Sequence, residues 1–178
     1  MAHSQANNYL ALVIKTQRLH ERDLIVTLLT REQGKITTVA KGVRHLSSSK
    51  RAFLEGGNLI HAQLITTKNW PLLTQAQLVA DASSIRTDLI GLKKFLLFLE
   101  ILDRLLVSEE LSPELFEQIL YLRQMLLARV RNDLVAERFQ SVLDQLGFGR
   151  SHQVHASINQ QVNQILDDNL RSFEYFQV

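Results

Sequence analysis

The chain has 178 residues, of which 46% are apolar, and a formal net charge of +2 at neutral pH. An apolar fraction of this size excludes large-scale disorder, and the length allows one domain or two small ones. There is no cysteine, which excludes disulfide bonds, thiolate zinc sites and a cysteine nucleophile. Neither a secretion signal nor an apolar run long enough to span a bilayer is present. We therefore expect a cytoplasmic protein.

Residues 1–80 are predicted to form five short strands. Apolar and β-branched runs occupy residues 9–18, 24–30, 35–41, 58–66 and 72–79. Gly34 should have a positive φ in the turn before the third strand, where Ile36, Thr38 and Ala40 share one face. A longer loop follows the third strand. Because closure removes exposed edges, this pattern favours a closed barrel, and the five-stranded OB-fold is the leading candidate.

Residues 81–178 are predicted to be helical. The hydrophobic period changes from two to about 3.6 near Ala80, which marks the domain boundary. The first helix should be buried on several sides, with Leu92, Phe95 and Leu96 in its apolar stripe. Ser112 and Pro113 are a strong signal for the start of the second helix. The four predicted helices cover about residues 83–107, 113–130, 132–147 and 154–170.

The net charge conceals two halves of opposite sign. Residues 1–80 contain ten Lys or Arg against four Asp or Glu, whereas residues 81–178 contain ten against fourteen. This asymmetry predicts two modules with different partners. The basic half is the candidate for binding a polyanion. The acidic half, which includes the stretch from Glu109 to Glu117, is the candidate for binding a protein.

Residues 30–51 are the most distinctive segment, since a glycine turn and a Thr/Val-rich strand lead there into a cationic, serine-rich loop. No acidic residue occurs between Glu32 and Glu55. Lys and Arg displace condensed counterions and Ser hydroxyls bond phosphate oxygens, so the segment predicts binding to a nucleic-acid backbone. The alternative is an ordinary solvated loop. The candidate binding residues are Lys15, Arg18, Arg22, Arg31, Lys35, Lys41, Arg44, Lys50 and Arg51.

No pattern of catalytic residues is evident. His152 and His155 have H-x-x-H spacing, with Asp167 and Asp168 downstream, but a metal site would need further ligands held at fixed geometry. The sequence contains no G-x-S-x-G turn, P-loop or H-E-x-x-H motif. We therefore expect no enzymatic activity, no metal and no cofactor.

The basic half resembles the RecO family of bacterial recombination mediators. The resemblance rests on a Glu-x-Asp turn, a Thr-Arg-Glu-x-Gly-Lys hairpin, an Ala-Lys-Gly-x-Arg segment and a following serine. These are residues 21–23, 30–35, 40–44 and Ser48, and Leu54, Asn58, Leu59 and Leu64 continue the match without a gap. In the helical half the similarity is looser and involves residues 137–139, 146–148 and 170–172.

The resemblance implies an N-terminal OB-fold (residues 1–80) and a C-terminal helical domain (residues 81–178). Such proteins bind single- and double-stranded DNA, anneal complementary strands and help load the RecA recombinase onto DNA covered by single-strand-binding protein. The resemblance also implies a RecR-like partner, a role in RecF-pathway repair and a nucleoid-associated location. The acidic half is then expected to contact single-strand-binding protein or a RecR-like ring. None of this is enzymatic turnover.

Three departures from the family pattern qualify these expectations. Many members carry a four-cysteine zinc ribbon after the Leu-Gly-Phe segment, and its absence here predicts a chain without zinc. His45 and Leu46 stand in a loop that is usually more cationic, and the chain is shorter than usual. The alternative function is therefore a protein-interaction module that keeps the barrel but has little DNA affinity. Whether the nine candidate cations share one face of the barrel should distinguish the two functions.

Aromatic rings for base stacking are scarce. OB-folds bind single strands by combining a cationic groove with stacking rings. The candidates here are Tyr9, Phe53 and Trp70. Trp70, next to Pro71, either forms an exposed stacking platform or closes the barrel.

Overall fold

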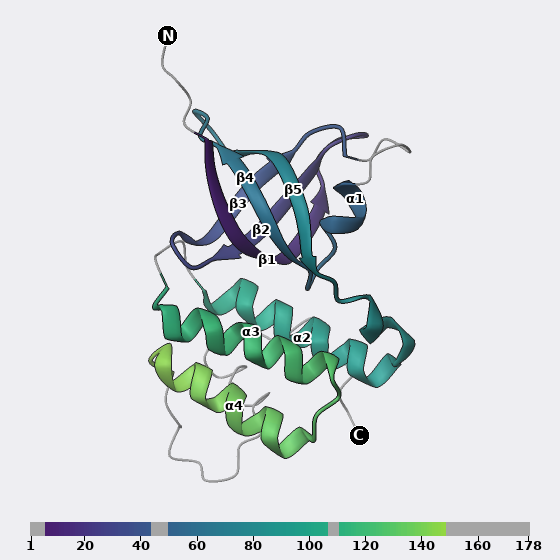
Figure 1. The fold of residues 1–178 in the computed structure, drawn as a ribbon, viewed down its shortest axis with the longest axis vertical. Helices are drawn as coiled ribbons and strands as arrows, with labels where there is room; N and C mark the ends of the chain where they lie inside the picture. Colours follow the sequence, from purple (N-terminus) through teal and green to yellow (C-terminus); the bar gives the residue numbers. More distant parts are fainter. Residues whose placement is uncertain (1–5, 44–49, 107–110, 149–178) are drawn as a thin grey trace. The chain divides into compact units, whose positions relative to one another are not determined.

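The computed structural model describes residues 6–43, 50–106 and 111–148, without the side chain of Lys50 (Figure 1). The described residues belong to two compact units. One lies within Met1–Ala82 together with Leu106–Leu111, and the other lies within Ser83–Leu105 and Ser112–Val178. The first unit contains the strands and the second contains the long helices. The predicted order of a β-sheet followed by helices is confirmed.

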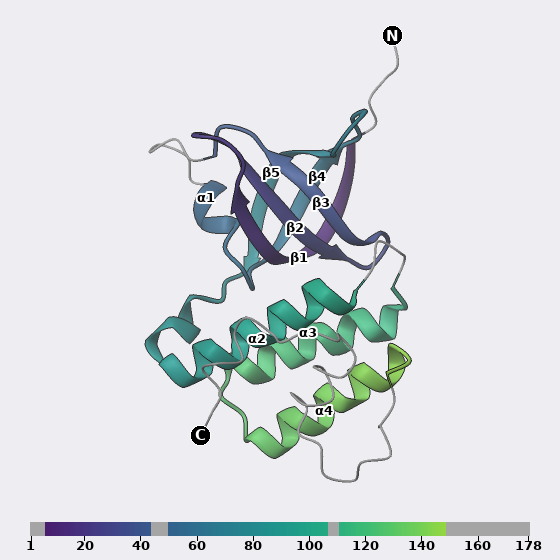
Figure 2. The same ribbon diagram turned by 180° about the vertical axis from the view of Figure 1, so that it is seen from behind.

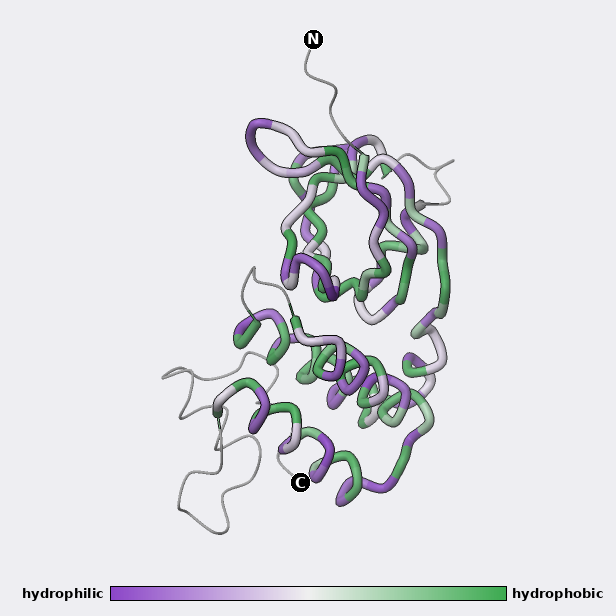
Figure 3. Tube along the Cα trace, turned by 60° about the vertical axis from the view of Figure 1, so that its left-hand side comes forward, coloured by the Kyte–Doolittle hydropathy of each residue, from purple (hydrophilic) through white to green (hydrophobic). Residues whose placement is uncertain are grey.

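Five strands form the first unit: β1 (Ala6–Arg18), β2 (Leu24–Thr30), β3 (Gly34–Ala40), β4 (Leu59–Ile65) and β5 (Leu72–Ala80). They close into a barrel in the order β1-β2-β3-β5-β4 (Figures 1 and 2), which Figure 3 shows as a ring. The long β1 pairs with β4 through its first half and with β2 through its second half. A single parallel pair, Val39 with Leu72, closes the barrel between β3 and β5. All five predicted strands are confirmed.

The interior of the barrel follows the predicted alternation. In β3, Thr38 and Ala40 are fully buried and Ile36 packs against the same core. The buried hydroxyl of Thr38 donates to the carbonyl oxygen of Pro71 at 2.7 Å, which satisfies a polar group that would otherwise be costly inside the core. Gly34 has a φ of 57°, as predicted for the turn that begins this strand.

A short helix between β3 and β4, α1 (Lys50–Phe53), was not predicted. Asn58 holds its end in place. The Asn58 side-chain amide donates to the carbonyl oxygens of Ala52 and Phe53 at 3.0 and 3.2 Å, and its oxygen accepts from the Ala82 backbone at 2.9 Å. Because Asn58 is only 4% exposed, the position requires a side chain that both donates and accepts.

The helical unit begins with a 3-10 turn, η1 (Ser83–Thr87), followed by α2 (Leu89–Leu105). The predicted continuous helix from Ser83 or Ser84 is therefore wrong at its start. The cause is Asp88, whose carboxylate accepts from the backbone nitrogen of Ile90 at 3.1 Å and so begins a new helix. The buried residues of α2 lie between Phe95 and Leu105 and form the expected apolar stripe, but Leu96 is 48% exposed and does not belong to it.

The other described helices are α3 (Pro113–Leu127) and α4 (Asn132–Gln145). The predicted capped start of α3 is confirmed, since the Ser112 hydroxyl accepts from the Leu115 backbone at 3.1 Å. The helix ends earlier than the predicted Val130 because Arg129 has a φ of 54°, which is outside the helical region. The end of α4 just before Gly147 agrees with the prediction. The predicted fourth helix, residues 154–170, lies outside the described residues.

Candidate nucleic-acid interface

Strand pairing brings several of the predicted cations to one end of the barrel. Arg18 pairs with Leu24, and Leu24 pairs with Ala40. The end of β1, the start of β2 and the end of β3 are therefore level with one another. Arg22 lies in the loop that joins β1 to β2, and Lys41 directly follows β3.

A hydrogen bond joins the loop that contains Arg22 to the segment that contains Lys41. The Asp23 carboxylate accepts from the backbone nitrogen of Gly42 at 2.9 Å. Asp23 belongs to the β1–β2 loop, and Gly42 follows Lys41 in the segment after β3. The bond therefore fixes the position of Arg22 relative to Lys41, although neither cation takes part in it.

The turn between β4 and β5 reaches the same end. The carbonyl oxygen of Pro71 accepts from the Val39 backbone at 2.9 Å, and it also accepts from the hydroxyl of Thr38. Val39 is two residues before Lys41, so these bonds hold Pro71, three residues after Lys68, against the last residues of β3. Lys68 was absent from the sequence-based set of candidates. Only the β3–β5 contact, which joins segments distant in sequence, reveals it.

We call this group of exposed cations the loop-end cluster. Within the part of the chain that the structure describes, its members form no ion pair. Glu21 and Asp23 are nearby acids in the β1–β2 loop, so positive charge remains in excess. Unpaired, exposed cations are available to phosphates without first breaking an internal contact. The cluster consists of Arg18, Arg22, Lys41 and Lys68.

Two other candidates lie at the opposite end of the barrel, so the nine cations do not share one face. Arg31 and Lys35 flank the β2–β3 turn, and Lys35 is about 20 Å from Lys41 at ~3.3 Å per residue. Arg31 pairs with Glu32 at 3.3 Å. Leu29, the cross-strand partner of Lys35, is completely buried. Leu29 therefore offers a nucleic acid no surface beside Lys35.

The remaining candidates have different surroundings. Lys15 pairs with Thr27 in the middle of the β1–β2 ladder, is partly buried and interacts with neighbouring groups. Arg51 is exposed on α1. Arg44 and the side chain of Lys50 lie outside the described residues, so their predicted contacts stay predictions.

Of the three candidate rings, Trp70 is the exposed one. It is 46% exposed, which favours the exposed platform over a ring that closes the barrel. Tyr9 and Phe53 are partly buried against the barrel core. Trp70 is therefore the ring that a nucleic acid could reach.

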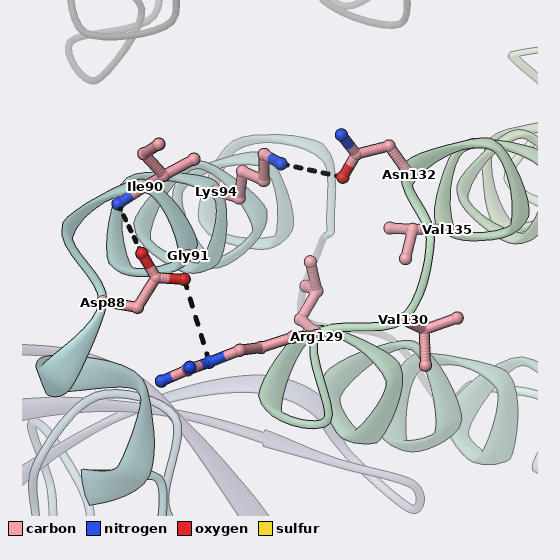
Figure 4. Close-up of a pocket in the computed structure, with 9 residues that line it drawn as sticks. Asp88, Ile90, Gly91, Lys94, Arg129, Val130, Asn132 and Val135 are labelled. Carbon is pink, nitrogen blue, oxygen red and sulfur yellow. Dashed lines mark hydrogen bonds and ion pairs between the residues drawn. The ribbon is translucent and has the colours of Figure 1, made fainter.

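The helical unit contains a small pocket of about 100 Å³ beside the start of α2 (Figure 4). Two cations line it, and both are engaged. Arg129 lies 3.8 Å from the Asp88 carboxylate and donates to the Thr87 hydroxyl at 2.9 Å, while Lys94 donates to Asn132 at 2.7 Å. These contacts link helix ends, so we assign the pocket a structural role.

The described residues show no cluster of three or more metal-ligating side chains. His152 and His155 fall outside them, and the expected absence of zinc stays a prediction. Among the helices that the structure describes, none has both the length and the apolar character needed to cross a membrane.

Comparisons with known proteins agree with the resemblance. Residues 5–82 match the family model described as recombination protein O N terminal. A DNA repair protein RecO of Heliobacterium modesticaldum is 36% identical over 141 residues, covering 78% of this chain and 50% of that protein. A DNA repair protein RecO of Nocardioides sp. is 37% identical over 111 residues, covering 62% of this chain and 45% of that protein. The chain thus spans about half the length of these curated relatives.

Proposed function

Because the chain belongs to the RecO family of DNA repair proteins, we propose that it is a recombination mediator that works by binding rather than by enzymatic turnover. It binds single- and double-stranded DNA, anneals complementary strands and helps to load a recombinase onto DNA coated with single-strand-binding protein. It acts without a cofactor in the bacterial cytoplasm, in association with the nucleoid. The loop-end cluster is the observation that carries the DNA-binding part of this proposal.

We infer that the barrel is an OB-fold. An OB-fold has five strands, and its β2–β3 face and its β1–β2 and β4–β5 loops bind oligonucleotides. The closed barrel of five strands, with β2 next to β3, fits that description. The two recognition loops of an OB-fold correspond here to the loops that contain Arg22 and Lys68. Two of the four cations of the loop-end cluster are thus in the loops where this fold binds nucleic acids.

Contacts of this type suit strand annealing. Lys and Arg that bind phosphates release counterions and carry no sequence information, so binding is expected to be independent of sequence. Base edges then stay free to pair with a second strand. Neutralised phosphates also let two strands approach with less repulsion. A cationic barrel end therefore supports annealing without an enzymatic step.

The division of the cations between two ends supports the alternative function, a protein-interaction module with little DNA affinity. Arg31 and Lys35 lie too far from Lys41 to strengthen a compact site. A salt titration distinguishes the two functions. If the four cations of the loop-end cluster each neutralise one phosphate, log K for single strands falls against log salt with a slope of about −3, using ~0.7 per phosphate. Binding that is undetectable even at low salt would favour the protein-interaction module.

We propose that the helical half contacts single-strand-binding protein or a RecR-like ring rather than DNA. Glu114 and Glu117 are exposed in the first turns of α3 and give this region acidic character. Charge reversal of both to Lys in the full chain is expected to weaken capture of the partner and to leave DNA affinity unchanged. If partner capture is unchanged, the contact lies elsewhere.

A further inference from the structure

We propose that Trp70 stacks on an exposed base and gives the barrel a preference for single-stranded over duplex DNA. This inference rests on the proposed DNA binding and adds the strand specificity of that site. Trp70 is a large ring that is 46% exposed. Roughly half of the residue is therefore held against the protein while the remainder faces solvent.

The backbone of the turn that carries Trp70 is held in place by hydrogen bonds. The Thr67 hydroxyl donates to the Trp70 carbonyl oxygen at 2.7 Å and accepts from the Asn69 backbone at 3.3 Å. Pro71, the next residue, restricts its own φ through its ring and is hydrogen-bonded to β3 at 2.9 Å. A ring carried on an ordered turn loses little conformational freedom when a ligand binds, and this strengthens the interaction.

The surroundings of Trp70 suit a nucleic acid. Lys68 lies two residues earlier in the same turn, and the turn is bonded to β3 two residues before Lys41. The ring is thus carried between segments that supply phosphate-binding cations. OB-folds hold single strands by this combination of a cationic path and a ring on which a base can stack.

Stacking distinguishes single strands from duplexes. The bases of a duplex are already stacked on each other, so their faces are closed to an external ring unless a step is opened. A single strand exposes its base faces, and the indole can use them without reading their edges. Trp70 therefore adds affinity for single strands only. The edges of the stacked base stay free to pair, which is compatible with annealing.

The test uses the full chain, a poly-thymidine oligonucleotide and a duplex of equal length at one salt concentration. Trp70 is the only tryptophan in the sequence, so indole fluorescence reports on it alone. We expect the single strand to quench this fluorescence and the duplex to bind without quenching it. Trp70→Ala should weaken single-strand binding about 5- to 150-fold, the range for one stacked base, and leave duplex affinity and both salt slopes unchanged.

Two further variants control for folding. Trp70→Phe keeps a ring and should retain most of the single-strand affinity. Val79→Ala truncates another barrel residue that is 46% exposed, and it should change neither affinity. Single-strand binding without quenching, or an equal loss of both affinities in Trp70→Ala, overturns the inference. If the unmodified chain binds neither DNA, the proposed DNA binding itself fails, which is a distinguishable result.

Discussion

For the substitution Asp23→Ala, the change in charge and the loss of the observed hydrogen bond predict opposite changes in DNA affinity. Asp23 is acidic and close to Arg22, so its removal makes the barrel end more positive. On charge alone the variant should bind DNA more tightly. The Asp23 carboxylate, however, accepts from the Gly42 backbone at 2.9 Å and connects the loops that carry Arg22 and Lys41. Without this bond the two cations lose their fixed relative position.

We expect loosening of the loops to dominate. A bond to a charged group contributes ~1.5–3 kcal/mol in general, and solvent exposure places this one at or below the lower end, about 1 kcal/mol of unfolding free energy. Ordering the released loops again on DNA costs ~0.5–1.5 kcal/mol for each immobilised side chain. This cost applies to two side chains, Arg22 and Lys41, and the removal of one negative charge offsets part of it. Asp23→Ala should therefore bind DNA about 5- to 10-fold more weakly than the unmodified chain.

The matched control is Glu21→Ala. Glu21 is exposed in the same loop, and its carboxylate forms no hydrogen bond with another described residue. This variant removes the same charge without removing the connection between the loops, so it should bind DNA more tightly than the unmodified chain. Fluorescence anisotropy at fixed salt measures both affinities. If Asp23→Ala tightens binding as much as Glu21→Ala does, the positioning argument is wrong.

Four further variants test either the salt dependence of DNA binding or the free energy of unfolding. Arg18→Ala combined with Lys41→Ala should flatten the single-strand salt slope by about 1.4 units, whereas Lys35→Ala, at the opposite end of the barrel, should leave the slope unchanged in the same titration. Asn58→Ala removes three hydrogen bonds from a buried position and should lower the free energy of unfolding in urea by about 2–4 kcal/mol. Ser112→Ala removes the α3 cap and should cost about 1 kcal/mol in the same measurement, with DNA affinity unchanged.

The sequence predicted the strands well because their determinants are local. Alternating burial in β3 and the positive φ of Gly34 depend on side-chain period and turn chemistry, which a reader of the sequence can see. The start of α2 was missed for a local reason too. Asp88 competes with the serines as a helix cap, and its carboxylate forms the decisive bond. Which of several capping residues starts a helix depends on small energy differences that residue type alone does not reveal.

The composition of the site could not be predicted in the same way. Lys35 lies at the start of β3 and Lys41 directly follows its end. The two appeared equivalent in the sequence, yet they lie at opposite ends of the barrel. Lys68 is distant in sequence from the cationic segment, and the β3–β5 pairing brings its turn to the same end of the barrel. Strand order is a property of the whole barrel. Local patterns identified the cationic segment, and only the closure of the barrel determines which cations can act together.

That closure also determines which segments meet at the proposed binding site. β3 and β5 meet at one residue pair, Val39 with Leu72, and the Pro71 carbonyl oxygen then accepts from both Val39 and Thr38. The same contacts that seal the core therefore place the turn with Trp70 against the end of β3. In the proposed function, a phosphate-binding cation and the Trp70 ring at this end of the barrel then engage one DNA strand.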